Sequence, residues 1–537
     1  MKKVLLLCMV VALVAFPVFA DPGNGNGNAY GLAKVDQSTK NDKSPNLRDM
    51  KPIPPELGPA REKYEPKRVN KGAGQPADAE DPVIQSAVTP ATPSVLSTFE
   101  GVGLGNYAVN AAPPDTNGAV GRQYTDGTGT HQWYVQWVNE AFAVFNAQTG
   151  AIVYGPANGN TIWQGFGGVC QSRNDGDPIV QYDKINNRWI MTQFAVGSQP
   201  YTQCVAVSTG PDPTGSYNRY SFSYANQFND YPKVGVWPDG YYVTYNMFTN
   251  GSTFGGGWVC AWDGAKMRAG LAATQQCFNT GTAHGGELPS DFDGTTLPPA
   301  GEPNYVVEFA TNSINYWKFH VDWTTPANTT LTGPINLPVS AFTPACGSGG
   351  TCITQSGTTQ QLDSLGDRMM YRMAYRNMGT YGAIVVNHSV KTGTTKKNQG
   401  TGVRWYELRV NGTNMSVFQQ STFSPDSATH RWMGSMAMDK VGNIVMGYSK
   451  SSSSMFPSIF YTLRNATDPV NTMQPEVSVF GGTGSQLRSL SRWGDYAALS
   501  VDPTDDCTMY FTTEYLSTSG TFNWHTRVGK VKASNCN

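Results

Sequence analysis

The amino-acid sequence predicts an all-β fold, a β-propeller, and two observations lead to it. A module of polar cluster, apolar strand, tight turn and aromatic-rich strand returns about every sixty residues, and the 58 glycines and 12% aromatic residues are typical of a turn-rich β protein. Because one such module cannot bury both of its faces, its copies have to pack against one another in a ring. The clearest copies pair 177–183 with 188–194, 231–237 with 241–245, 432–439 with 443–448, and 494–502 with 507–515.

Residues 1–20 have the pattern of a secretory signal peptide. Lys2 and Lys3 precede the apolar run 4–16, and the segment ends in the small residue Ala20. No later run approaches the roughly 20 apolar residues that a membrane-spanning helix needs. We therefore expect a secreted protein that is extracellular, periplasmic or attached to the cell surface, with a mature chain that starts at Asp21.

Residues 21–93 are rich in Pro, Asn, Gly, Lys and Asp and have almost no apolar periodicity. A segment of this composition cannot bury enough surface to offset its chain entropy. We expect a disordered leader or linker, serving either as a spacer from the cell surface or as a pro-segment.

Residues 94–537 form the predicted propeller domain. The first turns of its copies lie near positions 127, 185, 239, 378, 440 and 503, with gaps of 58, 54, 139, 62 and 63. The gap of 139 is about twice the others, so it holds one further copy, with strands at 304–310 and 314–323. This spacing predicts seven blades. Six or eight also fit, because the first strand around 288–292 is degenerate.

Each copy has room for four antiparallel strands. In the clearest one, 188–196 is followed by strand patterns at 203–208 and 217–224. Four strands per blade account for the period. The last copy is one strand short, because the chain ends soon after 524–532. Residues 94–101 can supply the missing strand, which would close the ring and remove its exposed edges.

Eight cysteines remain once Cys8 of the signal peptide is set aside, and they fall into close neighbours along the chain. An oxidising compartment lets such neighbours pair, and adjacent strands of a blade bring them together. Zinc ligation is the alternative, but it lacks a C-x-x-C motif. The predicted disulfides join Cys170 to Cys204, Cys260 to Cys277, Cys346 to Cys352, and Cys507 to Cys536.

The charge of the chain argues against nucleic acid as a partner. The net charge is -1 and only 14% of the residues are charged. Phosphate binding needs a basic stripe, and the lysines and arginines do not form one. We expect a monomer whose partner is an extracellular glycan or a protein.

Charged residues stand immediately before most of the predicted first strands. The first strand of a propeller blade is innermost, so these positions converge at one mouth of the central channel. Convergent polar groups in a concave site are typical of ligand binding. Turn caps and ion pairs between blades are the structural alternative. The positions are Asp115, Asn117, Asp175, Asp177, Asp230, Lys233, Asp367, Arg368, His430, Arg431, Arg492 and Asp495.

Carboxylates beside arginines suit glycan chemistry. One carboxyl group could act as acid or base, while arginines hold an anionic sugar through paired hydrogen bonds. The catalytic candidates are Asp177, Asp230, Glu407 and Asp495. The candidates for ligand binding are Arg368, Arg431, Arg492, His430 and Asp367.

No cofactor is required by any motif, although calcium is a weak candidate. Asp291 and Asp293 precede Gly294, and Glu302 follows eleven residues after Asp291, which brings hard oxygen ligands close along the chain. The pattern departs from an EF-hand at Thr295 and in its lack of flanking helices. A solvated acidic turn is the alternative.

The stretches 177–183, 188–189, 430–439 and 492–496 resemble those of large secreted bacterial propeller proteins that mostly lack an assigned activity. The likeness covers roughly 94–536. More distantly, the chain resembles sialidase-type propellers. That resemblance implies an arginine cluster, a Tyr-Glu pair and an Asp at one mouth of the channel.

Two departures limit the resemblance to sialidases. The repeated Asp-box, Ser-x-Asp-x-Gly-x-x-Trp, is missing, and only the stretch 438–443 comes near its turn. Tyr406 and Glu407 imitate the Tyr-Glu pair, yet neighbouring strand residues point to opposite faces. The resemblance therefore implies architecture and assigns no catalytic residue.

Three functions follow as hypotheses. The first is a secreted propeller that binds a glycan, a peptide or a surface partner through its loop face. The second is a sialidase-like glycoside hydrolase or a polysaccharide lyase that acts in the central pocket. The third is a structural or adhesive extracellular protein with no pocket.

Overall fold

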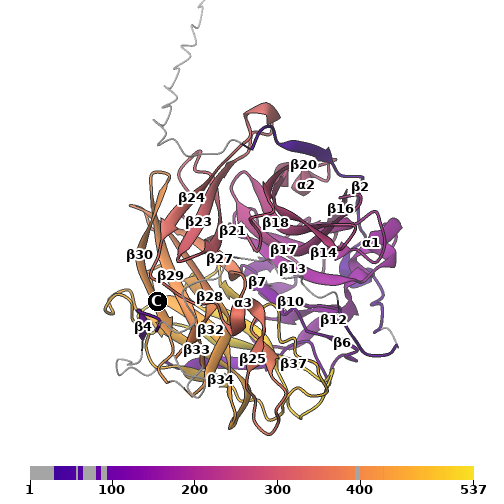
Figure 1. Ribbon diagram of the computed structural model, residues 1–537. Coiled ribbons are helices and arrows are strands. Elements are labelled where there is room, and N and C mark those ends of the chain that lie inside the picture. Colours follow the sequence, from indigo (N-terminus) through magenta and orange to yellow (C-terminus); the bar gives the residue numbers. More distant parts are fainter. Residues whose placement is uncertain (1–29, 56–57, 64–79, 86–92, 394–399, 427) are drawn as a thin grey trace, which may run out of the picture.

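The computed structural model describes residues 30–55, 58–63, 80–85, 93–393, 400–426 and 428–537. The predicted signal peptide, 1–20, lies outside these ranges. The described chain is nearly all β, as predicted, and successive sheets follow one another around the middle of the molecule (Figure 1). None of the described helices is both long and apolar enough to cross a membrane.

The strands form antiparallel groups of four that follow the chain. The first groups are β7 (Asn117–Val120), β10 (Trp133–Val138), β11 (Ala141–Asn146) and β12 (Ile152–Asn158); β13 (Gly176–Asp183), β14 (Arg188–Ala195), β15 (Thr202–Ser208) and β16 (Tyr217–Ser223); and β17 (Gln227–Trp237), β18 (Gly240–Thr249), β19 (Thr253–Trp262) and β20 (Thr274–Gly281).

The next groups continue the same order. They are β21 (Leu288–Asp293), β22 (Asn304–Ala310), β23 (Ser313–His320) and β24 (Thr330–Pro338); β27 (Met370–Asn377), β28 (Gly382–Thr392), β29 (Gly400–Asn411) and β30 (Asn414–Phe423); β31 (His430–Met438), β32 (Ile444–Ser452), β33 (Met455–Arg464) and β34 (Val477–Phe480); and β35 (Ala498–Val501), β36 (Met509–Tyr515) and β37 (His525–Val531) with β5 (Val95–Glu100). The group β21 to β24 is the copy expected within the long gap.

The first strands of these groups line the middle of the molecule. Strands β7, β13, β17, β21, β27, β31 and β35 contact one another in this order, and β35 contacts β7. Hydrogen bonds do not join the groups into one closed sheet within the described ranges. Backbone pairing joins β21 to β27 and β29 to β31, so three neighbouring groups share one sheet. Side-chain packing holds the other groups of the ring together, and the large buried core cluster spans several groups.

Strand β5 pairs antiparallel with β37, from Glu100 opposite Arg527 to Val95 opposite Val531. This pairing confirms that a segment from the start of the domain completes the last group. The two ends of the domain are thereby tied by backbone hydrogen bonds, which leaves no unpaired edge on that side of β37.

The described part of the leader is ordered, so the expectation of a disordered 21–93 is wrong there. β1 (Lys34–Gln37) pairs with β20, and β2 (Lys40–Lys43) pairs with β16. Side chains add to the backbone pairing, since Asp42 accepts two hydrogen bonds from buried Arg219 at 2.8 and 2.7 Å. The composition of the leader could not predict these strands, because their hydrogen-bond partners are the outer strands of sheets formed by distant parts of the chain.

Later parts of the leader also pack on the domain. β3 (Arg61–Glu62) runs parallel to β6 (Ala111–Ala112), and β4 (Ile84–Gln85) runs parallel to the end of β30. Asp81 pairs with the buried Arg404 at 2.7 Å.

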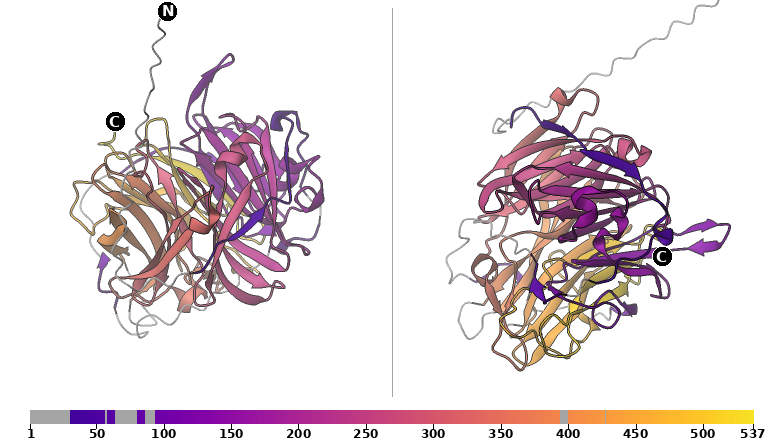
Figure 2. Two further views of the ribbon diagram at one scale, coloured as in Figure 1. Left: turned by 90° about the horizontal axis from the view of Figure 1, so that it is seen from above. Right: turned by 90° about the vertical axis from the view of Figure 1, so that its right-hand side faces the viewer.

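Short elements complete the fold, and the hairpin of β8 (Tyr124–Asp126) and β9 (Gly129–His131) projects from the body of the molecule (Figure 2). The others are η1 (Leu47–Asp49), η2 (Gly159–Trp163), α1 (Gly168–Ser172), α2 (Gly264–Ala269), η3 (Pro326–Asn328), α3 (Cys346–Gly349), β25 (Thr351–Ile353) and β26 (Leu362–Asp363).

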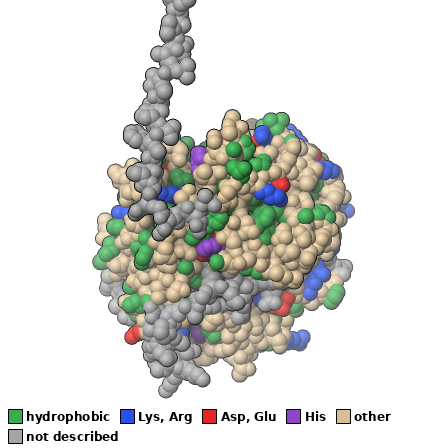
Figure 3. All heavy atoms as spheres, turned by 45° about the horizontal axis from the view of Figure 1, so that its top comes forward, with side chains coloured by type: hydrophobic (Ala, Val, Ile, Leu, Met, Phe, Trp, Pro, Cys, Tyr) green, Lys and Arg blue, Asp and Glu red, His purple; other side chains and the backbone are tan. Residues whose placement is uncertain are grey.

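All four predicted disulfides are present. Cys260 and Cys277 lie directly opposite each other on β19 and β20. Four disulfides fit an extracellular protein, because such bonds persist in oxidising compartments. On the face in Figure 3, the Lys and Arg side chains that are visible lie scattered among uncharged ones.

Candidate functional site

Bulges near the starts of the first strands aim side chains toward the middle of the ring. The pairing registers of β13, β17 and β31 each shift near the start of the strand. A residue with positive φ stands at each shift: Asp177 at 46°, Tyr231 at 55° and Met433 at 55°. A bulge of this kind redirects a side chain that a regular strand would place elsewhere.

Seven ionisable side chains gather where the first strands begin, and we call them the axial cluster. They are Asp115, Asp177, Asp230, Lys233, Arg368, Arg492 and Asp495. Electrostatic interactions link them across sheets, for example Asp115 with Asp177, Asp495 and Arg492. All seven are buried. The sequence predicted every member at the mouth of the channel.

Lys233 lies between two tyrosine rings. Its Nζ is 3.3 Å from the ring centroid of Tyr231 and 3.5 Å from that of Tyr496, and it donates to the carbonyl of Pro232 at 2.9 Å. Burial lowers the pKa of Lys233 well below its usual value, although Asp177 acts in the opposite direction. The aromatic faces therefore supply part of the stabilisation that water would give the ammonium group.

The arginines of the axial cluster already have carboxylate partners. Arg368 donates to Asp367 at 2.7 and 3.0 Å, and its guanidinium lies 4.4 Å from the ring centroid of Tyr231. Arg492 pairs with Asp495, and its Nη1 donates to the carbonyl of Lys63 at 2.7 Å. These pairs occupy much of the anion-binding capacity expected from the sequence.

Several carboxyl oxygens of this region are buried without a hydrogen-bond partner in the described part of the chain. They are Oδ1 of Asp115, Oδ2 of Asp230 and Oε1 of the neighbouring Glu514. In contrast, Asp177 accepts hydrogen bonds from the Tyr496 hydroxyl at 2.8 Å and from a backbone amide. Buried polar atoms in native proteins are nearly always paired, so these oxygens require an explanation.

Burial raises the pKa of several carboxyl groups in and beside the axial cluster. Burial, together with the charge of Asp177, raises the pKa of Asp230 to about 8. Burial and the charges of Asp177 and Asp495 raise the pKa of Asp115 well above its usual value. Burial also raises the pKa of Glu514. At pH 7 Asp230 therefore carries a proton for most of the time.

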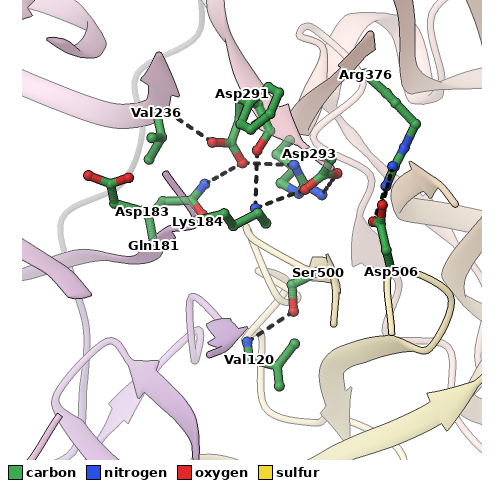
Figure 4. Close-up of polar contacts among 12 residues, drawn as sticks. Val120, Gln181, Asp183, Lys184, Val236, Asp291, Asp293, Arg376, Ser500 and Asp506 are labelled. Atoms are coloured by element: carbon green, nitrogen blue, oxygen red, sulfur yellow. Dashed lines mark hydrogen bonds and ion pairs between the residues drawn. The ribbon is translucent and has the colours of Figure 1, made fainter. Parts of the chain in front are cut away.

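A second charged group lies between the first strands (Figure 4), and its members form ion pairs with one another. Arg372 bonds to Asp291 at 2.7 Å and also pairs with Asp293, which bonds to Lys184 at 2.8 Å. Gln181 also donates to Asp291, at 3.0 Å. Burial acts to raise the pKa of Asp293, but the cations Arg372 and Lys184 lower it to about 2.

This pairing bears on the weak calcium candidates. Asp291 and Asp293 face cations, and Glu302 accepts hydrogen bonds from the hydroxyls of Tyr305 and Tyr375 at 3.1 and 3.0 Å. Among the residues that the structure describes, no three His, Cys, Asp or Glu side chains are grouped as metal ligands. The three candidates are therefore used in internal contacts.

Three other predicted site residues lie away from the axial cluster. Arg431 pairs with Glu476 and Asp426, each at 2.6 Å. Glu407 pairs with Arg409 at 2.8 Å on the outer part of its sheet.

His430 lines a separate cavity of about 390 Å³ beside the Cys346–Cys352 disulfide. Burial, with the charge of Arg431, lowers the pKa of His430 to about 4. The imidazole is therefore uncharged at neutral pH.

Sequence reasoning missed three participants in the site. Tyr231 and Tyr496 directly follow the predicted residues Asp230 and Asp495. The repeated Asp-Tyr dipeptide could therefore have indicated both tyrosines. Glu514 lies inside β36, the second strand of its group, where no mouth position was expected.

No protein-family model matches the chain, and no curated protein matches it. Solved structures with some similarity include an endo-arabinase from Bacteroides thetaiotaomicron, at 10% identity and a TM-score of 0.25 over 67% of this chain and 94% of that one. A Hadza microbial sialidase gives 10% identity and 0.25, over 76% and 74%. Drosophila Plexin A gives 8% and 0.28, over 82% and 87%. Similarity at these values supports no argument about function.

Proposed function

We propose that the protein is a secreted seven-bladed β-propeller that binds a saccharide at its axial cluster. One observation carries the proposal: in the described chain, carboxyl oxygens of Asp115, Asp230 and Glu514 are buried without hydrogen-bond partners in or beside the axial cluster. Leaving such atoms unpaired costs about 1–3 kcal/mol each. A ligand with several hydroxyl donors would remove that cost.

The circle of contacts between the first strands supports seven blades. Each of the seven strands contacts the next, and β35 returns to β7. The starts of the strands then face one mouth of a central channel, where the axial cluster lies. The four disulfides support secretion.

The ligand that fits this chemistry is neutral. Arg368 and Arg492 are already paired with Asp367 and Asp495, so an acidic sugar would have to break an ion pair. In the described part of the chain, the unpaired buried atoms include carboxyl oxygens of Asp115, Asp230 and Glu514, which accept hydrogen bonds from hydroxyl groups. The Nε of Arg492 and the hydroxyl of Tyr231 are unpaired as well and can donate to the oxygens of a sugar. We therefore replace the acidic glycan expected from the sequence with a neutral saccharide.

A panel of immobilised neutral, amino and uronic saccharides tests the proposal, followed by calorimetry on the tightest binder. Asp230→Ala removes an unpaired acceptor, so affinity should fall at least about tenfold, the equivalent of one lost hydrogen bond of about 1.4 kcal/mol. Glu407→Gln changes a buried carboxylate outside the cluster and should leave affinity unchanged. Equal losses in both variants, or preferential binding of uronic saccharides, would contradict the proposal.

Hydrolysis of the bound saccharide is the second candidate function, and the raised pKa of Asp230 favours it. A carboxyl group that is protonated at neutral pH can donate to a glycosidic oxygen, while an ionised carboxylate acts on the opposite side. Asp495, whose partner is Arg492, is the candidate carboxylate. Product release followed by NMR should disappear in Asp230→Asn while binding remains. If the wild-type protein binds the saccharide stably and releases no product, hydrolysis is rejected and binding remains as the proposed function.

A further inference from the structure

Residues 61–63 of the leader lie at the axial cluster. Arg61 and Glu62 pair in parallel with Ala111 and Ala112, shortly before Asp115. These two leader side chains are exposed, whereas Lys63 is 8% exposed. We call residues 61–63 the leader cap.

Lys63 connects the starts of three first strands. Its amide donates to the carbonyl of Ala112 at 2.9 Å, in the segment that leads to β7. Its Nζ donates to the carbonyl of Asn174 at 2.8 Å, just before β13. Its carbonyl accepts the hydrogen bond from Arg492, just before β35. The leader cap therefore crosses the mouth formed by these three sheets.

The leader cap uses a hydrogen-bond donor of the axial cluster. Arg492 interacts electrostatically with Asp115, Asp177 and Asp495, so it belongs to the axial cluster, and the carbonyl of Lys63 uses one of its donors. The carboxyl groups behind it are almost inaccessible to solvent. A saccharide that bonded to Arg492 through this donor would displace the contact.

The leader is anchored on both sides of the cap. Upstream, Asp42 of β2 bonds to Arg219, and downstream Asp81 bonds to Arg404. The cap itself is joined to the domain backbone by a two-residue parallel pairing. It can therefore lift locally while the rest of the leader stays bound.

We propose that the leader cap is an autoinhibitory segment that closes the axial cluster and has to lift before a ligand enters. This proposal rests on the proposed function, which makes the axial cluster the ligand-binding site. The closure itself can be measured without a saccharide. It assigns a regulatory role to a segment that the sequence suggested to be a spacer or a pro-segment.

Carbodiimide labelling of carboxyl groups with glycine ethyl ester, read by mass spectrometry, tests the closure. Lys63→Met removes the bond to Asn174 but keeps the aliphatic side chain. The labelled fraction of Asp177 should rise at least about threefold, because opening exposes the carboxyl group. The control Arg48→Ala breaks a pair with Asp212 elsewhere on the leader and should leave labelling unchanged. Unchanged labelling in folded Lys63→Met would overturn the proposal.

Hydrogen exchange on the wild-type protein provides a test that does not depend on folding of the variant. The amide of Lys63 should exchange at least tenfold faster than the paired amides of β2, because only the cap opens locally. Equal exchange rates would overturn local lifting. Neither measurement uses a saccharide, so failure of the saccharide panel with increased labelling would reject the proposed function and leave the closure intact.

Discussion

Replacing Asp230 with Asn should stabilise the protein at neutral pH, which is unusual for a change of a buried charged residue. Asp230 is 1% exposed, and burial with the nearby Asp177 raises its pKa from 3.8 to about 8. Between pH 4 and 8 the folded protein keeps the proton, while the unfolded chain releases it. Stability therefore falls as pH rises through this window. Asn resembles the protonated carboxyl group and does not ionise.

The magnitude follows from the difference between pH 7 and the unfolded pKa. About three pH units at 1.36 kcal/mol each give an upper limit of about 4 kcal/mol for the gain at pH 7. At pH 4 the folded protein is protonated and the unfolded chain is close to its own pKa of 3.8, so Asp230→Asn and wild type should then differ by less than about 1 kcal/mol.

Asp293→Asn is the matched control, since it changes another buried aspartate in the same ring. Burial acts to raise its pKa, but Arg372 and Lys184 lower it to about 2, so its contribution is present at pH 7 and lost as pH falls from 4 to 2. Removing this carboxylate leaves two buried cations underpaired, at a cost of about 3–5 kcal/mol.

Chemical denaturation at pH 4, 5, 6, 7 and 8 measures both effects. The free energy of unfolding of Asp230→Asn should exceed that of wild type increasingly with pH, while Asp293→Asn should be less stable at pH 7. A loss of stability in Asp230→Asn at pH 7 comparable to that in Asp293→Asn would refute the reasoning. It would mean that Asp230 is ionised and paired.

Three further predictions concern other contacts. Replacing both Cys507 and Cys536 with Ser should lower the free energy of unfolding by about 3 kcal/mol, measured by denaturation, because their separation is 29 residues. Asp42→Ala should cost about 2 kcal/mol and speed hydrogen exchange in β2, because Arg219 is 2% exposed and loses its carboxylate partner while it keeps its bonds to two backbone carbonyls. His430→Asn should be progressively more stable than wild type as pH falls from 6.5 to 4, because the folded pKa of His430 is about 4; parallel pH profiles would contradict this.

Local patterns in the sequence predicted much of the fold. The repeat located the copy hidden before residue 378, and 94–101 was correctly paired with the last strands. Cysteines that are near neighbours along the chain form the disulfides, because strands adjacent in sequence are adjacent in a blade. These features depend on contacts between segments that are neighbours along the chain, and the sequence shows such neighbours directly.

The leader was not predictable by the same reasoning. Its strand β1 has little apolar pattern, and its order depends on pairing with the outer edge of β20. Hydrogen-bond partners of that kind come from residues more than two hundred positions away, such as Cys277 opposite Lys34. The composition of a segment indicates how much surface it can bury. It does not indicate whether the outer strand of a sheet elsewhere in the chain is free to pair with that segment.

The candidate site was predictable in part. Asp177, Asp230 and Asp495 stand just before or within the first strands, and the structure brings them together. Arg431 also stands near the start of a first strand, two residues before the positive-φ residue Met433, yet its side chain pairs with Glu476. The direction of a side chain at a bulge depends on backbone dihedrals that residue type alone does not determine.

A crystal structure of the protein with the neutral saccharide that binds tightest is the most direct test of saccharide binding at the axial cluster. We expect a sugar whose hydroxyl groups bond to Asp115, Asp230 and Glu514, with residues 61–63 displaced from Arg492. A saccharide bound on the outer loops, with the contact between Lys63 and Arg492 intact, would contradict it.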